Sequence, residues 1–585
     1  FGCVSALSAQ GRSELLLEKN WKFTREDNNE FIKPAFDDSK WQSVTVPHDW
    51  AIYGPFSSLN DKQEVAISQD GQKEAMEHAG RTGGLPFVGV GWYRTEFDVP
   101  QFQAGKRATI LFDGAMSHAN VYINGQKVGY WPYGYNSFHF DITKYLKPGE
   151  KNTLAVRLEN LPESSRWYPG AGLYRNVHLI ITEDAYIPVW GTYITTPSVN
   201  EKFAKVNVRT KVVLPEGADP AKYSVETSVW NPNKQKLTAV RTSLAQMKYN
   251  NNQAEQEFVI QAPSLWSPEM PALYSAETRL YEGDKLKDIY TTPFGIRSIE
   301  IIPDKGFFLN GKRTVFKGVC NHHDLGPLGA AVNDAAIRRQ IRILKDMGCN
   351  AIRTSHNMPA PELIRACDEM GMMIMAESFD EWNVAKCKNG YNLLFDEWAE
   401  KDLVNLLHNF RNNPSVVMWC IGNEVPNQWN EGDCKIAKWL QDICHREDPT
   451  RPVTQGMDAP DAVVNNNFAA VMDVAGFNYR PFKYKINYKK LPQRIVLGSE
   501  TASTVSSRGV YKFPVERKAM AKYDDHQASS YDVEHCGWSN LPEDDFIQHE
   551  DLPYCIGEFV WTGFDYLGEP TPYYTDWPSH SSLFG

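Results

Sequence analysis

The sequence lacks any long apolar segment. None of its 585 residues belongs to a run approaching the ~20 consecutive apolar residues that span a membrane. The formal net charge of -11 argues against nucleic acid or an anionic membrane as a partner, because both require a basic surface. The 10 cysteines include no C-x-x-C pair and no Cys/His cluster at metal-ligand spacing. We therefore expect no membrane span, no nucleic-acid partner and no cysteine-based metal site.

The amino-terminal residues differ in composition from those that follow. Residues 1–10 are apolar and small, and the polar stretch Gly11-Arg12-Ser13-Glu14 comes next. This pattern is typical of the end of a secretory signal peptide with cleavage near Ala9, although a lipid-anchored Cys3 or a cytoplasmic leader are alternatives. We assign 1–11 as a signal-peptide remnant or leader and expect export to the periplasm or the extracellular space.

Short strands and turns fill the first half of the chain. Residues 108–112 and 121–123 are strand-like, and Asn124-Gly125 supplies a hairpin turn. Clean alternation of apolar and polar residues at Val206, Val208 and Thr210 begins a second series of strands. A length of 585 residues is too great for one core. The pattern predicts two all-β domains, 12–184 and 185–298, the second an immunoglobulin-like β-sandwich.

From residue 299 strands alternate with helices. Ile337, Ile341 and Leu344 share one helix face, and Gly348 ends that helix; Pro361 opens the next one. Eight such strands predict a (β/α)₈ TIM barrel over 299–585, with strands at 315–319, 350–353, 373–377, 416–424, 452–454, 475–479, 495–500 and 556–561. A barrel requires a helix after its last strand, and the sequence stops at Gly585 in a Pro/Ser/Gly-rich stretch. We therefore expect the barrel to be incomplete here and the chain to be part of a longer protein.

Two glutamates, Glu424 and Glu500, follow buried strands four and seven. Catalytic groups of a TIM barrel lie at the carboxyl ends of its strands. One glutamate at such a position is usually a structural ion pair, but two in one barrel favour catalysis. Paired carboxyls at one mouth are the groups that cleave a glycosidic bond.

Six further motifs stand at residues 165–175, 265–268, 318–324, 350–357, 422–424 and 498–501. In this order they resemble family 2 of the glycoside hydrolases, which contains β-galactosidases, β-glucuronidases and β-mannosidases. The resemblance covers the chain from Trp21 onward. The resemblance implies a multidomain β plus α/β protein, with an amino-terminal jelly-roll β-sandwich similar to a sugar-binding domain, then an immunoglobulin-like sandwich and the catalytic barrel.

The resemblance also implies a role for individual residues. Glu424 resembles the acid/base and Glu500 the nucleophile, while Tyr479 resembles the tyrosine that hydrogen-bonds the nucleophile. A barrel-core phenol is the alternative for Tyr479, as core packing is for Trp561. The implied substrate-binding set is Asn423, His322, His356, Tyr479, Trp561, Arg353, Arg166 and Trp167, with Arg353 holding the nucleophile region.

Departures from the family pattern narrow the prediction. Glu381 is the nearest match to a magnesium ligand, but Asn383 stands where a histidine is usual, so we assign no metal ligands and no cofactor; Mg²⁺ and Na⁺ stay open. The Asn-x-Lys pair of glucuronidases and the Trp-Asp-Trp-Gly signature of β-mannosidases are not evident. We predict an exo-acting retaining β-galactosidase whose partner is a carbohydrate. The alternatives are a β-glucuronidase or other family 2 β-glycosidase, and a non-catalytic glycan-binding protein; a homo-oligomer stays open.

Overall fold

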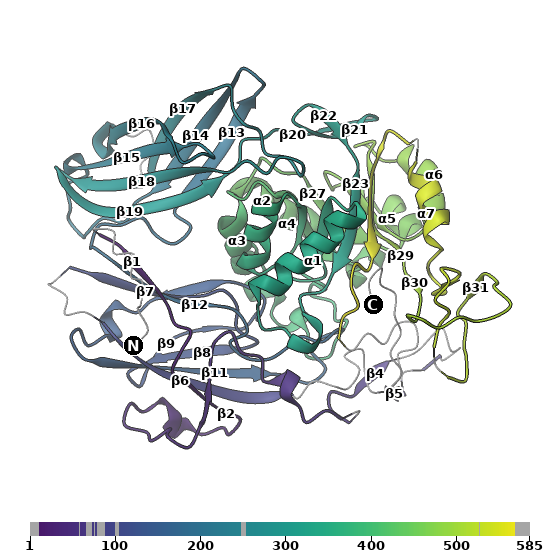
Figure 1. Cartoon of the computed structure of the whole chain (residues 1–585), viewed down its shortest axis with the longest axis horizontal. Helices are drawn as coiled ribbons and strands as arrows, with labels where there is room; N and C mark the ends of the chain where they lie inside the picture. The colour runs from purple at the N-terminus through teal and green to yellow at the C-terminus, as the bar shows by residue number, and fades with distance from the viewer. Residues whose placement is uncertain are drawn as a thin grey trace.

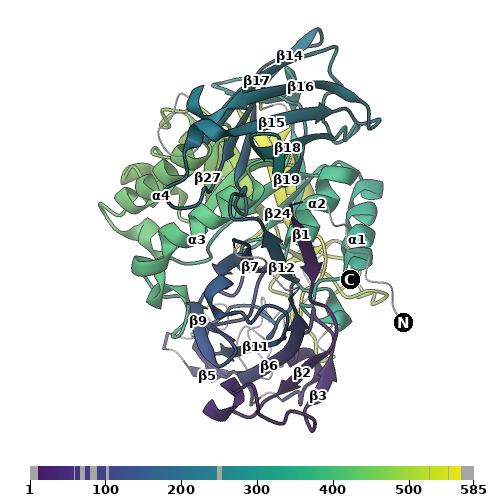
Figure 2. The same cartoon turned by 90° about the vertical axis from the view of Figure 1, so that its left-hand side faces the viewer.

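The computed structural model describes residues 11–567, apart from 58, 66–72, 75, 79–87, 100–104, 247–252, 526 and 551. The expected signal-peptide remnant, except Gly11, and the chain after residue 567 lie outside these residues. Figure 1 shows two β-domains, drawn purple to teal, stacked beside a barrel drawn green to yellow. Turned by 90°, the same arrangement has the immunoglobulin-like sandwich at the top and the jelly roll at the bottom (Figure 2).

The first domain packs two antiparallel sheets face to face. Asn124-Gly125 forms the expected turn between its strands β8 and β9, with Asn124 at φ 51° and Gly125 at φ 82°. One sheet has the order β1 (Ser13–Leu16), β12 (Val177–Thr182), β7 (Arg107–Phe112) and β10 (Phe138–Asp141). The other has the order β3 (Gln42–Val44), β2 (Trp21–Thr24), β6 (Gly89–Asp98), β11 (Lys151–Asn160), β8 (Ala119–Ile123) and β9 (Gln126–Trp131). The short strands β4 (Gln63–Val65) and β5 (Met76–His78) form a separate two-stranded sheet.

The second domain is the expected immunoglobulin-like sandwich. Val206, Val208 and Thr210 all point into its core, so the alternation in the sequence identified the buried face correctly. Its sheets have the orders β13 (Thr192–Val199), β14 (Phe203–Lys211), β17 (Gln253–Gln261), and β16 (Lys236–Ser243), β15 (Tyr223–Trp230), β18 (Tyr274–Glu282), β19 (Lys285–Phe294). A small sheet leads into the barrel: β20 (Ile299–Ile302), β21 (Gly306–Leu309) and β22 (Lys312–Thr314).

The third domain contains a closed barrel of eight parallel strands, as predicted. Every residue of the fourth barrel strand is buried, because helices cover its outer face and neighbouring side chains fill the inside. Around the ring the strands are β23 (Phe316–Asn321), β24 (Ala351–Thr354), β25 (Met373–Glu377), β26 (Val416–Asn423), β27 (Val453–Met457), β28 (Ala475–Asn478), β29 (Val496–Ala502) and β33 (Cys555–Trp561). Along the chain, β29 and β33 are separated by a segment that forms a small sheet of β30 (Thr504–Val505), β32 (Glu534–His535) and β31 (Lys518–Ala519).

Helices surround the barrel, and the two that were predicted from Gly348 and Pro361 are present. The first, α1 (Asp334–Met347), begins with the Asn333 side chain accepting from the Ala336 N–H and ends at Gly348 with φ 103°. The second, α2 (Pro361–Met370), has Pro361 in its first turn and ends at a left-handed Gly371. The remaining helices are α3 (Phe395–Phe410), α4 (Cys434–Glu447), α5 (Pro460–Asn465), α6 (Tyr484–Tyr488) and α7 (Pro542–His549). None of the helices in the described ranges is long and apolar enough to cross a bilayer.

Buried hydrogen bonds attach the jelly roll to the barrel. The Arg175 guanidinium donates to the Met358 carbonyl at 2.8 Å, and the Tyr133 hydroxyl donates to the Ser378 carbonyl at 2.7 Å. The loop between β11 and β12, which contains Arg166 and Trp167, is thereby held at the carboxyl-terminal mouth of the barrel.

Candidate active site

Two glutamates meet at the carboxyl-terminal mouth of the barrel. Glu424 directly follows β26, and Glu500 lies near the end of β29. The amide nitrogen of Asn478, the last residue of β28, donates to Glu424 Oε1 at 2.9 Å and to Glu500 Oε2 at 3.3 Å. Since one nitrogen contacts both, these oxygens are at most about 6 Å apart, a limit that includes the ~5–5.5 Å between the carboxyls of retaining glycosidases.

Glu500 is held by strong donors in a buried position. Arg353 Nη1 donates to Glu500 Oε2 at 3.0 Å, and the Tyr479 hydroxyl donates to Oε1 at 2.7 Å. Burial and then the charge of Glu424 raise the pKa of the Glu500 carboxyl to about 8, while Arg353 and the Tyr479 hydroxyl act to lower it. The negative charge of Glu424 thus opposes the ionisation of Glu500, and Arg353 and Tyr479 favour it.

Arg353 is the central cation of the site. Its side chain is fully buried on β24, and Nε donates to Glu377 Oε2 at 2.5 Å while Nη2 donates to Asn423 Oδ1 at 2.9 Å. An unpaired guanidinium at this depth would be costly, so the carboxylates of Glu377 and Glu500 on either side are what make its burial tolerable. Arg353 therefore connects β24, β25, β26 and β29 at one point.

His356 lies beside the same carboxylates. Its Nδ1 is 2.8 Å from Glu377 Oε1, and its Nε2 is 3.7 Å from Glu500 Oε2. Burial and the nearby Arg353 charge keep the pKa of His356 well below its ordinary value, so the ring is neutral. When Glu377 is ionised, as its pairing with Arg353 favours, it accepts from Nδ1–H, and this tautomer leaves Nε2 as an acceptor.

Arg166 reaches the barrel mouth from the jelly roll and pairs with Asp380. Arg166 Nε and Nη2 donate to the two Asp380 oxygens at 2.8 and 2.5 Å. Lys386 Nζ lies 3.0 Å from Asp380 Oδ1 and 2.6 Å from the Asn423 carbonyl, and the Asn423 amide donates to Asp380 Oδ1 at 3.1 Å. Although burial acts to raise it, the pKa of Asp380 lies well below its usual range because of Arg166 and Lys386.

Aromatic rings form one side of the site. The rings of His356 and Trp561 are parallel, 5.2 Å apart, and His322 meets the edge of Trp561 at 5.3 Å. Trp167 packs on His322 at 4.9 Å, and its indole N–H donates to the Tyr135 hydroxyl at 3.0 Å. All ten site residues expected from the sequence thus lie in one connected region. Two of them, Arg166 and Trp167, come from the jelly roll and the others from the barrel.

Two of these residues have unusual backbone conformations. Glu424 has φ 41° and Tyr479 has φ 58°, in the left-handed region that residues other than glycine seldom adopt. Such conformations cost of order 1–3 kcal/mol each and persist where the surrounding structure requires them. Here they turn the chain at the ends of β26 and β28 so that both side chains face the mouth.

Four further residues belong to the site although they were not predicted from the sequence: Glu377, Asn478, Asp380 and Lys386. Glu377 and Asn478 are the last residues of β25 and β28, so the strand-end rule that selected Glu424 also applies to them. Asp380 and Lys386 lie in the loop after β25, where no periodic pattern marks them.

Glu381, the nearest match to a magnesium ligand, is hydrogen-bonded to backbone N–H groups. Glu381 Oε2 accepts from the Cys387 N–H at 3.2 Å and Oε1 accepts from the Asn392 N–H at 3.2 Å, so the carboxylate holds the loop after β25. Within the described ranges no three His, Cys, Asp or Glu side chains group closely enough to hold a metal ion.

Glu558 on β33 is a buried carboxyl on the outer side of the barrel wall. It accepts from the Thr501 hydroxyl at 2.7 Å and lies 3.7 Å from His549, the last residue of α7, which packs on the outside of the barrel. Burial raises the pKa of the Glu558 carboxyl from 4.5 to about 8. A raised pKa alone therefore does not identify a residue of this site.

We expect Glu558→Gln to stabilise the protein at pH 9 relative to wild type and to change little at pH 4. The folded protein binds the Glu558 proton more tightly than the unfolded chain, so wild-type stability falls as the pH rises from about 4.5 to about 8. The amide has no proton to lose, and at ~1.4 kcal/mol per pKa unit the gain reaches a few kcal/mol. Thermal unfolding of wild type and variant at pH 4 and pH 9 measures this gain. If the variant differed from wild type by the same amount at both pH values, the raised pKa of Glu558 would be contradicted.

Known proteins resemble the chain over its whole length. Three family models match in order: the sugar binding domain of glycosyl hydrolases family 2 at residues 16–183, the family 2 central domain at 186–297 and the family 2 TIM barrel domain at 300–574. The chain is 38% identical to "Beta-galactosidase BoGH2A" of Bacteroides ovatus, covering 100% of this chain and 71% of that protein. It is 32% identical to a "Putative beta-glucuronidase" of Formosa agariphila, covering 95% of this chain and 52% of that protein.

A solved structure agrees with these matches. A glycosyl hydrolase family 2 member from Bacteroides cellulosilyticus superposes with a TM-score of 0.81 at 34% identity, covering 95% of this chain and 65% of that one. The resemblance and the domain architecture expected from the motifs are confirmed. The chain belongs to family 2 of the glycoside hydrolases and is a glycoside hydrolase.

Proposed function

We propose that the chain is an exo-acting retaining β-galactosidase, with Glu500 as nucleophile and Glu424 as acid/base. The observation that carries this proposal is the bridge from the Asn478 amide to both carboxyls, which keeps them within reach of one anomeric carbon. The 38% identity to a protein named a β-galactosidase supports galactose as the sugar.

In the first half of the reaction, the Glu424 carboxylic acid gives its proton to the glycosidic oxygen. Glu500 attacks the anomeric carbon, the bond to the leaving group breaks, and a covalent glycosyl ester forms. Arg353 and Tyr479 donate to Glu500 and favour its ionised form, whereas Glu424 accepts from the neutral amide of Asn478. We assign the proton of the first step to Glu424 because Glu500 has the stronger donors.

In the second half, the Glu424 carboxylate takes a proton from water, and the resulting hydroxide attacks the anomeric carbon. The bond to Glu500 breaks, the nucleophile is regenerated, and the sugar leaves with its original β configuration. Two inversions at one carbon give net retention.

The remaining residues orient the terminal sugar. Asn423 and Asp380, hydrogen-bonded to each other, present an amide and a carboxylate to its hydroxyls, and neutral His356 offers Nε2 as an acceptor. Trp561 supplies an apolar surface beside His356. The jelly-roll loop with Arg166 and Trp167 covers one side of the mouth, which supports action at a chain end.

A β-glucuronidase is the second candidate, supported by the 32% identical relative of that name. A uronate carboxylate would have to draw Arg166 or Lys386 away from Asp380, to which both are already bound. It would also enter a mouth that holds Glu424, Glu500 and Asp380, so repulsion disfavours it.

A panel of aryl β-glycosides distinguishes these candidates. We expect kcat/KM for the galactoside to exceed that for the glucuronide by at least about a hundredfold, the scale at which polar sites reject an analogue with the wrong groups. A preference for the glucuronide would replace the galactosidase assignment. Hydrolysis of no member would favour the non-catalytic glycan-binding alternative.

We also propose that the protein is exported. The support is the composition of residues 1–10, which is typical of the end of a signal peptide.

A further inference from the structure

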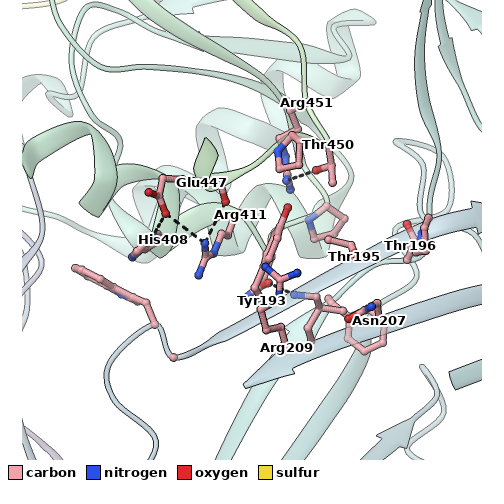
Figure 3. A pocket seen from close by; sticks show the side chains of 18 of the residues that line it. Tyr193, Thr195, Thr196, Asn207, Arg209, His408, Arg411, Glu447, Thr450 and Arg451 are labelled. Atoms are coloured by element: carbon pink, nitrogen blue, oxygen red, sulfur yellow. Dashed lines mark hydrogen bonds and ion pairs between the residues drawn. The ribbon is translucent and has the colours of Figure 1, made fainter. Parts of the chain in front are cut away.

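A cavity of about 860 Å³ lies between all three domains (Figure 3). One wall is a face of β13 and β14, and the opposite wall is formed by the ends of α3 and α4. Because α3 leads into β26 and α4 leads into β27, these helix ends lie at the amino-terminal mouth of the barrel. Glu424 and Glu500 lie at the other mouth, so the cavity is separate from the catalytic site.

The lining of this cavity is rich in cations. It contains two carboxylates, Glu300 and Glu447, and six basic side chains: Arg209, Lys211, Arg297, Arg411, Arg446 and Arg451. The whole chain, by contrast, has a formal net charge of -11. A concave surface of one sign attracts ligands of the opposite sign.

The single carboxylate of Glu447 is shared among three basic side chains. It already pairs with His408 and Arg446, each at 2.7 Å, and these contacts together hold its pKa at about 2. Its carboxylate also forms a long ion pair with Arg411 at 4.0 Å, and Arg411 donates to the Glu447 backbone carbonyl at 3.1 Å.

Arg411 and Arg209 approach each other from opposite walls. Arg411 lies over the Tyr193 ring at 4.4 Å, its buried Nε has no hydrogen-bond partner, and Figure 3 shows Arg209 pointing toward the same ring. Burial chiefly lowers the pKa of Arg411; Tyr193, Glu447 and Asp448 oppose this fall, and the Arg209 charge adds to it. Two guanidinium groups that repel across a cavity are stabilised by an anion between them.

Helix dipoles explain only part of this charge. Arg411 and Arg446 lie at the carboxyl ends of α3 and α4, where cations are favoured. Arg209 and Lys211 lie on β14, where they share one face with Asn207. Arg209 is 3.9 Å from Glu255 on the paired strand β17, whereas Lys211 lies opposite the uncharged Gln253.

The remaining lining fits a sugar. Trp190 and His139 meet edge to face at 5.3 Å, and Thr195 and Asn207 are paired in register on the sheet face. Asn412 bridges the walls by accepting from the Ile194 N–H at 2.8 Å and donating to the Thr192 carbonyl at 2.9 Å, so the cavity has fixed walls. An aromatic platform with fixed amide and hydroxyl groups is suited to a saccharide.

We infer that this cavity is a second carbohydrate site, which binds an acidic saccharide through Arg209, Lys211 and Arg411. The anionic group is a carboxylate or a sulfate carried by the sugar. The site serves to hold an acidic part of a glycan at the mouth opposite the catalytic centre. This inference does not depend on which sugar the catalytic site cleaves.

Calorimetric titration of the whole chain tests the inference, with trigalacturonate, a sulfated galactotriose, neutral galactotriose and inorganic sulfate as probes. We expect at least one acidic trisaccharide to bind, with an affinity that falls as salt rises. Arg209→Gln should weaken that binding about tenfold or more, as expected for the loss of a charge-assisted hydrogen bond. Which acidic trisaccharide binds more tightly identifies the anionic group.

Lys236→Gln is the matched control, because Lys236 is an exposed cation on β16 of the other sheet. It should leave binding unchanged, and neither variant should alter hydrolysis of an aryl β-galactoside. The inference is overturned if neutral galactotriose binds equally well, if sulfate alone binds as tightly, or if no probe binds. It is also overturned if excess galactose, acting at the catalytic site, displaces the acidic probe.

Discussion

Glu500→Gln should lower kcat for an aryl β-galactoside by at least ~10⁴-fold, the scale of loss when a catalytic nucleophile is removed. The amide has nearly the size of the carboxylate and can still accept from Tyr479, so the site keeps its shape. It cannot form the glycosyl ester, and therefore the first half of the reaction fails. Initial rates of the purified variant measure the effect.

Glu558→Gln is the matched control for this experiment. It makes the same chemical change in a buried barrel carboxyl that lies on the outer side of the wall beside Thr501. We expect its kcat to stay within a few-fold of wild type. Near-wild-type activity of Glu500→Gln, or equal losses in both variants, would contradict the role assigned to Glu500.

Glu424→Ala should lose ~10²–10⁴-fold in kcat, the usual contribution of a general acid/base, and azide should restore turnover of a substrate with a good leaving group. Such a leaving group departs without a proton, so Glu500 still forms the glycosyl ester. Azide needs no general base and attacks that ester from the face the leaving group vacated. The product is a β-galactosyl azide, and NMR of the anomeric proton identifies it.

Glu500→Gly provides the complementary variant. Azide then occupies the space of the missing nucleophile and attacks from the opposite face, so the expected product is the α-azide. If the products of the two variants were exchanged, the roles of Glu424 and Glu500 would also be exchanged. An α-azide from both variants would mean that the enzyme inverts configuration.

Local patterns were sufficient to predict most of the fold. Buried runs such as 416–424 read as parallel strands because both faces of a barrel strand are covered, and Gly348 and Pro361 mark helix ends because of their backbone conformations. The strand-end rule then identified Glu424 and Glu500, and it extends to Glu377 and Asn478. These features depend on short segments of chain, which periodicity describes well.

Contacts between distant segments could not be predicted in this way. Arg166 pairs with Asp380 across 214 residues and a domain boundary, and no pattern in either segment indicates the other. The position of Arg209 relative to Arg411 could not be predicted either. They face each other only because Asn412 and Tyr193 make hydrogen bonds between the immunoglobulin-like sandwich and the barrel.

The sequence by itself determined the order of domains, the barrel and the pair of glutamates, because burial and backbone geometry are encoded locally. Only the tertiary structure decided how those glutamates are held and charged. Their separation, the donors around Glu500 and the cations around Asp380 depend on side chains from another domain and from five barrel strands or the loops that follow them. Electrostatic interactions act through space, whereas the patterns in a sequence run along the chain.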